Sequence, residues 1–157
     1  VRKNKSGIVV KGLHDLAVRF SRCCNPVPGD EIVGFVTRGR GVSIHRTDCI
    51  NVINLPEDER GRLIDAEWQV AENPTSTEQY STEIQIFANN RIGLFADISK
   101  VFTEKQIDIT SMNVRTSKQG RATIIMTFDI HGTEELNRIT DKIRQIDGVL
   151  DIQRTTG

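Results

Sequence analysis

The sequence has few of the features that mark secreted and membrane-embedded proteins. Three cysteines among 157 residues are too few, and odd in number, for a disulfide framework, so we expect a reducing, cytoplasmic location. No run approaches the roughly 20 apolar residues of a membrane span, and no charged-then-apolar leader indicates secretion. The first residue is Val1 rather than Met, from which we expect a piece of a longer chain. These absences predict a globular protein with no membrane partner.

A net charge is also missing, because 21 basic residues balance 21 acidic ones. Taken over the whole chain, this balance argues against a nucleic-acid partner. The charges are unevenly placed, however. Residues 1–52 carry nine basic and four acidic groups, residues 53–79 carry two and seven, and residues 80–157 carry ten of each. The N-terminal third is therefore a basic segment with the potential to attract phosphates.

The acidic middle of the chain has the composition of a linker. Residues 72–78 are polar, contain a proline and lack apolar periodicity. We therefore divide the chain into an N-terminal domain of residues 1–70, a linker of residues 71–79 and a C-terminal domain of residues 80–157. Each domain is small enough that a metal, a partner or dimerisation would help to stabilise it.

Hydrophobic periodicity in the C-terminal half predicts an α+β fold of the ferredoxin-like kind. Apolar residues alternate at 84–88 and 122–130, and strands are also expected at 107–116 and 149–152. Helical spacing appears in two segments, residues 94–102 and 133–146. Thr133 is the expected N-cap of the second helix, and Gly148 its expected left-handed C-terminal cap. The order βαββαβ leaves one sheet face for a second copy or the N-terminal domain to cover.

The turn after the first of these strands is the candidate ligand site of the C-terminal half. Asn90 and Gly93 stand where the strand gives way to the helix, and a helix N-terminus offers free N–H groups to a carboxylate. The alternative is that Asn90 caps the helix and Gly93 relieves packing.

The N-terminal half reads as a small hairpin-containing α/β domain. A strand is expected at residues 8–10, and prolines stiffen residues 23–30. A hairpin follows, with strands at 32–36 and 42–44 and with Arg38 and Arg40 at its glycine-flanked tip. Beyond it, Thr47 or Asp48 is the expected cap of a short helix that runs to about Ile53.

Three cysteines and a histidine are candidate ligands of a metal ion. Cys23, Cys24, His45 and Cys49 could form a tetrahedral site, with Cys24, His45 and Cys49 as its core members. Adjacent cysteines rarely reach one ion, because successive side chains point apart in extended backbone. The alternatives are a reduced, metal-free cluster of buried thiols and a catalytic Cys–His pair. No acid or oxyanion element stands out beside such a pair, so structural zinc and the metal-free cluster remain the two main hypotheses.

The segment that starts at Asn90 resembles the ACT domain. That family has an acidic residue or Asn here, then Arg, a variable residue, Gly and Leu, and it often has Pro where this chain has Ile92. The resemblance implies a small-molecule effector, commonly an amino acid, bound across a dimer interface, and no catalytic cofactor. The implied effector contacts are Asn90, Ile92, Gly93, Leu94, Met112, Asn113 and Val114.

Residues 18–49 resemble the conserved-cysteine domain of long RelA/SpoT homologues, also called the zinc-finger or ribosome-intersubunit domain. In that family it directly precedes a C-terminal ACT domain. The resemblance implies the regulatory end of a bifunctional ppGpp synthetase/hydrolase, a GTP pyrophosphokinase that transfers pyrophosphate from ATP to GTP or GDP. Nothing matches the hydrolase His-Asp pair or the synthetase motifs, so we expect this piece to be catalytically inert.

The same resemblance implies docking on a ribosome whose A site holds uncharged tRNA. The arginines expected to meet ribosomal RNA are Arg22, Arg38, Arg40 and Arg46. Aromatic residues suited to base stacking do not alternate with them, so recognition would rest on backbone and shape. Two alternatives stay open: the basic face is ordinary solvated surface, or the chain is an amino-acid-binding ACT regulator of another metabolic enzyme with no RNA role.

Overall fold

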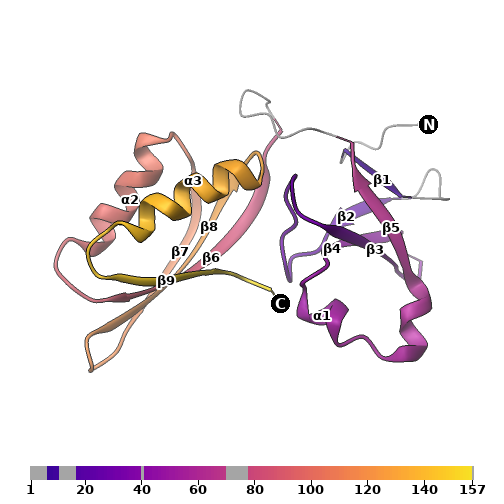
Figure 1. Cartoon of the computed structure of the whole chain (residues 1–157), viewed down its shortest axis with the longest axis horizontal. Helices are drawn as coiled ribbons and strands as arrows, with labels where there is room; N and C mark the ends of the chain where they lie inside the picture. The colour runs from indigo at the N-terminus through magenta and orange to yellow at the C-terminus, as the bar shows by residue number, and fades with distance from the viewer. Residues whose placement is uncertain (1–6, 11–16, 40, 70–77, 157) are drawn as a thin grey trace.

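The computed structural model describes residues 7–10, 17–39, 41–69 and 78–156. It contains two α+β units, each with its own sheet, that meet end to end (Figure 1). Within the described part of the chain, no helix has the length and apolar character needed to span a membrane. The predicted linker, residues 71–79, falls almost wholly outside the described residues.

The N-terminal unit is a five-stranded mixed sheet. Its strands follow the order β1-β5-β3-β4-β2, in which β2 runs parallel to β4 and all other neighbours are antiparallel. Their bounds are β1 Ile8–Val10, β2 Val18–Phe20, β3 Ile32–Val36, β4 Val42–Arg46 and β5 Leu63–Trp68. A short helix α1 (Ile50–Ile53) and a 3₁₀ helix η1 (Glu57–Arg62) lead from β4 to β5. Strands β2 and β5 and the 3₁₀ helix were not predicted.

The predicted hairpin is confirmed as β3 and β4. Its turn closes where the Thr37 N–H donates to the carbonyl of Gly41 at 2.8 Å, and Gly39 and Gly41 both adopt positive φ. The predicted cap of the following helix is wrong. Cys49 occupies the N-cap position of α1, while the Asp48 carboxylate pairs with an arginine of β4 instead.

The C-terminal unit confirms the predicted βαββαβ order. Its strands form an antiparallel sheet in the order β7-β8-β6-β9. The elements are β6 Tyr80–Asn89, α2 Leu94–Glu104, β7 Ile109–Thr116, β8 Arg121–Ile130, α3 Thr133–Arg144 and β9 Val149–Arg154. Alternate residues of β6 and β8 are buried beneath the two helices, where Phe102 and Phe128 meet edge to face at 4.8 Å. The predicted alternation therefore builds one apolar core.

Three predicted caps lie elsewhere in the structure. Helix α2 is capped by Gly93 at φ +84°, not by Asn90. Helix α3 begins at Thr133, so the cap is the preceding glycine. Gly148 does adopt a left-handed conformation at φ +99°, but it lies in the turn before β9, beyond the C-cap of α3 at Gln145. At Gly93 the chain enters α2 through a left-handed conformation, which glycine adopts more easily than other residues.

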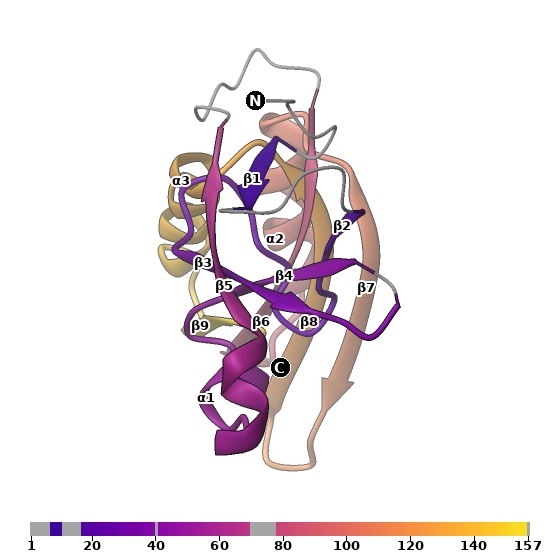
Figure 2. The same ribbon diagram turned by 90° about the vertical axis from the view of Figure 1, so that its right-hand side faces the viewer.

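The two units meet where β6 begins and β9 finishes (Figure 1), and the end-on view in Figure 2 has the N-terminal sheet in front of the C-terminal one. Val27, from the N-terminal unit, is fully buried and belongs to the apolar core of the C-terminal unit. An aromatic triad also bridges them: Phe20 stacks on Trp68 at 5.6 Å, and Tyr80 meets both rings edge-on at 5.7 and 5.5 Å. The contact thus combines apolar burial with aromatic packing.

Candidate metal centre

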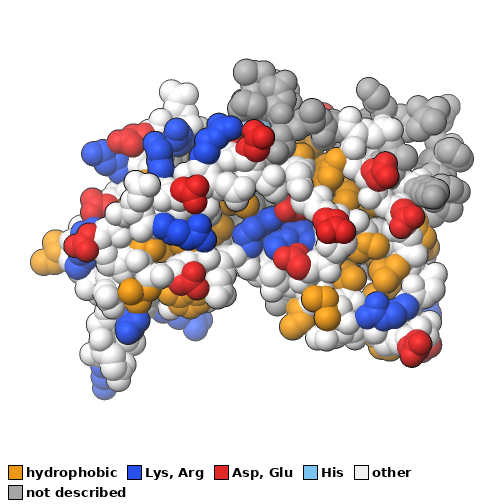
Figure 3. Space-filling model, in the orientation of Figure 1, with side chains coloured by type: hydrophobic (Ala, Val, Ile, Leu, Met, Phe, Trp, Pro, Cys, Tyr) orange, Lys and Arg blue, Asp and Glu red, His pale blue; other side chains and the backbone are white. Residues whose placement is uncertain are grey.

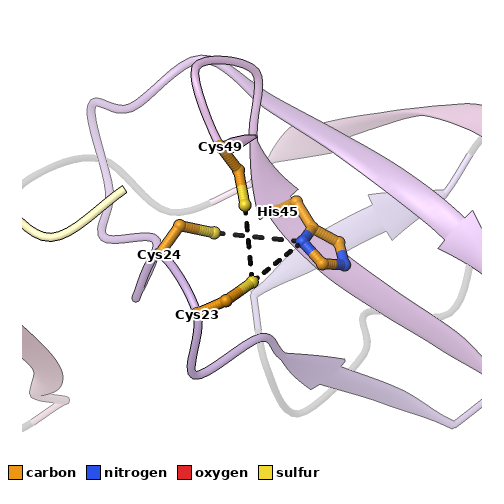
Figure 4. Close-up of side chains that lie close together, drawn as sticks. All are labelled: Cys23, Cys24, His45 and Cys49. Atoms are coloured by element: carbon orange, nitrogen blue, oxygen red, sulfur yellow. Dashed lines mark hydrogen bonds between the residues drawn. The ribbon is translucent and has the colours of Figure 1, made fainter. Parts of the chain in front are cut away.

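The topology of the N-terminal sheet brings the four predicted ligands together. Parallel pairing of β2 with β4 sets Phe20 opposite Ile44, so the chain that leaves β2 passes beside His45. Cys23 and Cys24 lie in the turn that follows, and Cys49 comes directly before α1. Their ligand atoms converge on one point, with Nδ1 of His45 facing the sulfurs (Figure 4).

The spacing of the ligand atoms suits a tetrahedral ion. All four lie within 4.8 Å of one another. The Cys23 sulfur is 3.4 Å from both His45 Nδ1 and the Cys49 sulfur, and the Cys24 sulfur is 4.0 Å from Nδ1. Zinc bonds of about 2.3 Å to sulfur and about 2.0 Å to nitrogen place tetrahedral ligands about 3.5–3.8 Å apart. The cluster could therefore hold zinc with small adjustments.

Cys23 and Cys24 can face one ion, although residues adjacent in sequence rarely do so. That expectation assumed extended backbone, in which successive side chains diverge. Residues 22–24 instead form a turn, and Asn25 follows at φ +49° in the left-handed region. Both sulfurs can thus face the same point.

A second layer of hydrogen bonds orients the ligands. The Ser43 hydroxyl lies 3.0 Å from Nε2 of His45, which leaves Nδ1 for the cluster. The Arg46 N–H donates to the Cys24 sulfur at 3.3 Å, and the Ser21 hydroxyl lies 2.7 Å from the Cys23 sulfur. Because a hydroxyl rather than a carboxylate orients the histidine, and no Asp or Glu joins the cluster among the described residues, the catalytic alternative lacks its third member.

The three thiols differ in the direction in which their surroundings shift the pKa. Burial raises the pKa of Cys24 well above its ordinary value, and burial also raises the pKa of Cys49. For Cys23, burial acts in the same direction, but hydrogen bonds led by Ser21 outweigh it and lower the pKa. Burial lowers the pKa of His45, which favours the neutral imidazole that a metal requires. Without a cation, Cys24 and Cys49 favour the neutral thiol.

The predicted RNA-contacting arginines that the structure describes differ in burial. Arg22 and Arg38 are exposed, and Arg40 lies outside the described residues. Arg46 is buried, and its guanidinium donates to the carbonyls of Cys24 and Thr155 and to the Asp48 carboxylate. The expected surface position of Arg46 is thus wrong, because its strand turns it inward to tie the two units together.

The loop part of the predicted effector site follows the end of β6 and leads into α2. Gly93 is exposed, and Ile92 is fully exposed. Asn90 is exposed too, and its N–H donates to the Gly120 carbonyl at 2.7 Å. Leu94 is fully buried, and its N–H donates to the carbonyl of Arg91 at 3.3 Å, so this residue adds no exposed surface to the predicted site.

The opposing part of the predicted effector site is the edge strand β7. Met112 and Val114 are large apolar side chains that remain exposed, and Asn113 between them is exposed as well. Strand β7 pairs with β8, and its own outer edge has no partner strand among the described residues. An exposed apolar edge of this kind is suited to a second chain or a ligand.

Arg91 holds the candidate effector loop, a role that the sequence reasoning missed. Its guanidinium donates to the Asp97 carboxylate at 2.7 Å and to the carbonyl of Asp147 at 2.8 Å. It thereby ties the loop to the first turn of α2 and to the turn before β9. The sequence signal for this role was an arginine in the loop followed six residues later by an aspartate that could pair with it.

Comparison with protein families gives one match for each unit. A model described as "RelA/SpoT RIS domain" matches residues 8–69, and one described as "ACT domain" matches residues 76–154. Among solved structures, the crystal structure of the ACT domain from GTP pyrophosphokinase of Chlorobium tepidum aligns with 22% identity and a TM-score of 0.45. That alignment covers 49% of this chain and 99% of the other.

Curated relatives match nearly the whole chain. GTP pyrophosphokinase of Streptomyces coelicolor is 40% identical over 150 residues, which cover 96% of this chain and 17% of that protein. GTP pyrophosphokinase of Escherichia coli K12 is 36% identical over 156 residues, which cover 99% of this chain and 20% of that protein. The chain thus spans about one fifth of the length of the curated relatives that it matches.

Proposed function

The chain belongs to the RelA/SpoT family, as a RIS domain followed by the ACT domain of a GTP pyrophosphokinase homologue, and from this premise we propose that it controls a (p)ppGpp synthetase/hydrolase. The observation that carries this proposal is the similarity of both domains, in one order, to GTP pyrophosphokinases along almost the whole chain. In the parent protein, other domains would make and hydrolyse the nucleotide in the cytoplasm. This region would report amino-acid supply to them.

The cysteine cluster is proposed to hold a structural zinc ion. Three sulfurs and one imidazole nitrogen form a complete tetrahedral donor set, so no position is left open for catalysis. The ion would supply a crosslink between the turn after β2, strand β4 and the start of α1. Metal analysis of the purified chain tests this, with about one zinc per chain expected and loss of the metal in Cys49→Ser. A metal-free chain that folds normally in the presence of zinc would contradict the proposal.

The N-terminal domain is proposed to dock on ribosomal RNA, with A-site tRNA nearby. Arg22 and Arg38 are exposed cations of this domain, and Arg40 joins them from the sequence of the hairpin tip. Lost phosphate contacts weaken binding and reduce its salt dependence. Co-sedimentation with ribosomes at several salt concentrations should therefore show weaker binding for the double variant Arg22→Ala, Arg38→Ala.

The matched control is Arg138→Ala, which removes an exposed arginine from α3 of the ACT domain. If the double variant, this control and the unmodified chain bind ribosomes with equal affinity, the two arginines do not contact the RNA. Ribosome binding also separates the main proposal from the alternative, an ACT regulator of another metabolic enzyme, which predicts none.

The ACT domain is proposed to bind an amino acid, with the branched-chain amino acids as first candidates. The loop of Asn90, Ile92 and Gly93 would receive it, and exposed Met112, Asn113 and Val114 would provide the opposing wall across a homodimer. Calorimetry with valine, isoleucine and leucine should give heat that Gly93→Asp removes, because a carboxylate there repels the ligand's own. No binding at millimolar concentration would refute the sensor proposal and leave the docking proposal intact.

A further inference from the structure

The loop that follows the adjacent cysteines is also the element that docks the ACT domain. Val27 is buried in the ACT core, and the Thr133 N–H donates to the carbonyl of Pro28 at 2.9 Å. Gly29 lies so close to α3 that an added Cβ would sit 2.1 Å from Oγ1 of Thr133. The cysteine turn and the docking contact are therefore parts of one short segment.

A charge pair locks this segment to the last strand of the ACT domain. Arg154, at the end of β9, donates to both oxygens of Asp30 at 2.6 and 2.9 Å and to the carbonyl of Asn25 at 3.1 Å. The two side chains are only 17% and 9% exposed. A bidentate pair this well buried depends strongly on geometry, since either partner alone would be an uncompensated charge.

His45 and Cys49 are each followed in sequence by a residue that hydrogen-bonds to the ACT domain. Arg46, next to His45, donates to the Thr155 carbonyl at 3.3 Å, and Ile50, next to Cys49, donates its N–H to the Thr156 carbonyl at 2.8 Å. Arg46 also contacts the cluster itself, because its N–H donates to the Cys24 sulfur. Each strand or turn that supplies a ligand thus also supplies a bond to the ACT domain.

Basic side chains gather where the two units meet, and the face seen in Figure 3 shows them there. A cleft of about 450 Å³ at this junction is lined by Arg46, Arg144 and Arg154 among others. Asp48 and Asp30 already pair with two of these arginines. These two arginines already have partners within the chain, so the junction is better described as an internal contact than as a site for an outside anion. We call the pair of Arg154 and Asp30 the latch.

We infer that metal binding at the cysteine cluster and docking of the ACT domain onto the RIS domain are thermodynamically coupled, an inference that rests on the proposed zinc site. Ligation holds the cysteine turn, His45 and the start of α1 in the arrangement from which the docking bonds are made. Because such coupling is reciprocal, docking raises metal affinity by the same factor by which the metal raises docking, so a variant with weakened docking should bind the metal less tightly. Loss of the metal, in turn, would release the ACT domain.

The decisive experiment measures zinc affinity after a change in the ACT domain alone. Arg154→Gln weakens the latch and also the bond to the Asn25 carbonyl but leaves all four ligands in place, and competition with a chromophoric chelator gives the affinity. We expect a loss of about 5-fold or more, the lower end of typical coupling between sites. The matched control is Arg138→Gln, which makes the same change at an exposed arginine paired with Glu134 inside the ACT domain and should leave affinity unchanged.

A second measurement follows the docking itself. Small-angle X-ray scattering of the unmodified chain should show a larger radius of gyration after chelation, while circular dichroism shows that the ACT helices persist. Unchanged zinc affinity in folded Arg154→Gln, or unchanged dimensions after chelation, would overturn the coupling alone. If the unmodified chain binds no zinc, the metal site fails and the coupling fails with it.

Discussion

The two domains are stabilised in different ways, although both are small α+β units. The ACT domain packs two amphipathic helices on a four-stranded sheet and buries a continuous apolar core. Among its described residues, the RIS domain has only a short α-helix, and its apolar residues divide into a small sheet cluster and a separate group around Cys24 and Cys49. The comparison teaches that one domain has a single continuous apolar core, whereas the other has a small sheet core and a second core that contains two of the four candidate ligands.

The largest effect should come from removing a ligand of the RIS domain. Cys24→Ser leaves three donors, and structural zinc sites contribute up to about 10–16 kcal/mol of apparent binding free energy to folding at neutral pH. We expect the RIS domain to lose its cooperative unfolding transition while the ACT domain keeps its own. Differential scanning calorimetry measures both, and two unchanged transitions in the zinc-loaded protein would contradict the assignment of a second core.

The converse change should affect the ACT domain and leave the metal in place. Phe102→Ala removes a fully buried ring that packs on Phe128, for which a cost of about 3–5 kcal/mol is typical. Urea unfolding followed by circular dichroism of the helices should show this loss. The folded variant should keep its zinc, whereas zinc that is lost as the helices unfold would follow from the coupling of metal binding to docking. An unchanged urea midpoint would show that the ring does not support the ACT core.

A smaller effect is expected at the contact between the domains. Gly29→Ala at φ +102° would force a methyl group against Thr133 and should cost about 1–3 kcal/mol. Gly39→Ala is the matched control, because that glycine has φ +78° but no atom within 4 Å of an added Cβ. Thermal unfolding of both variants separates backbone strain, which they share, from the docking clash. Equal losses would show that the contact at Thr133 is loose.

The smallest effect is a pH dependence at the aromatic triad. Burial, together with a hydrogen bond to Glu78, raises the pKa of Tyr80 to about 12. A raised phenol pKa stabilises the native state below pH 10 and is lost as pH rises from about 10 to 12, since the unfolded chain ionises first. Absorbance at 295 nm should show a single tyrosine ionising late. Ionisation near pH 10 in the folded protein would indicate that the two domains separate readily.

The ACT half was largely predictable because its strands alternate over long stretches. Ala122 to Ile130 places five apolar side chains on one face, which only a half-buried strand satisfies. Strand β5 went unrecognised because Asp65 and Glu67 lie in the acidic segment, although Ala66 between them is buried. Strand β2 has only three residues, too few for a period to show.

The ligand set was predictable in its members but not in its geometry. Nothing in the spacing of Cys23 and Cys24 reveals the turn that lets both sulfurs face one point. The burial of Arg46 did have a signal, since Val42 and Ile44 precede it on the same face of β4. The bond from Arg46 to Thr155 and the ion pair of Asp30 with Arg154 each join residues more than a hundred positions apart. Local sequence patterns cannot reveal such contacts.

The aromatic triad has a consequence for the chain that joins the domains. Trp68 and Tyr80 flank the predicted linker, and their rings are held 5.5 Å apart. The residues between them therefore close a loop whose ends are fixed by packing rather than by the linker's own length. Because closure entropy grows only logarithmically, doubling that loop would cost about 0.6 kcal/mol. Insertions there, including a reporter peptide or a protease site, should leave the paired domains in place.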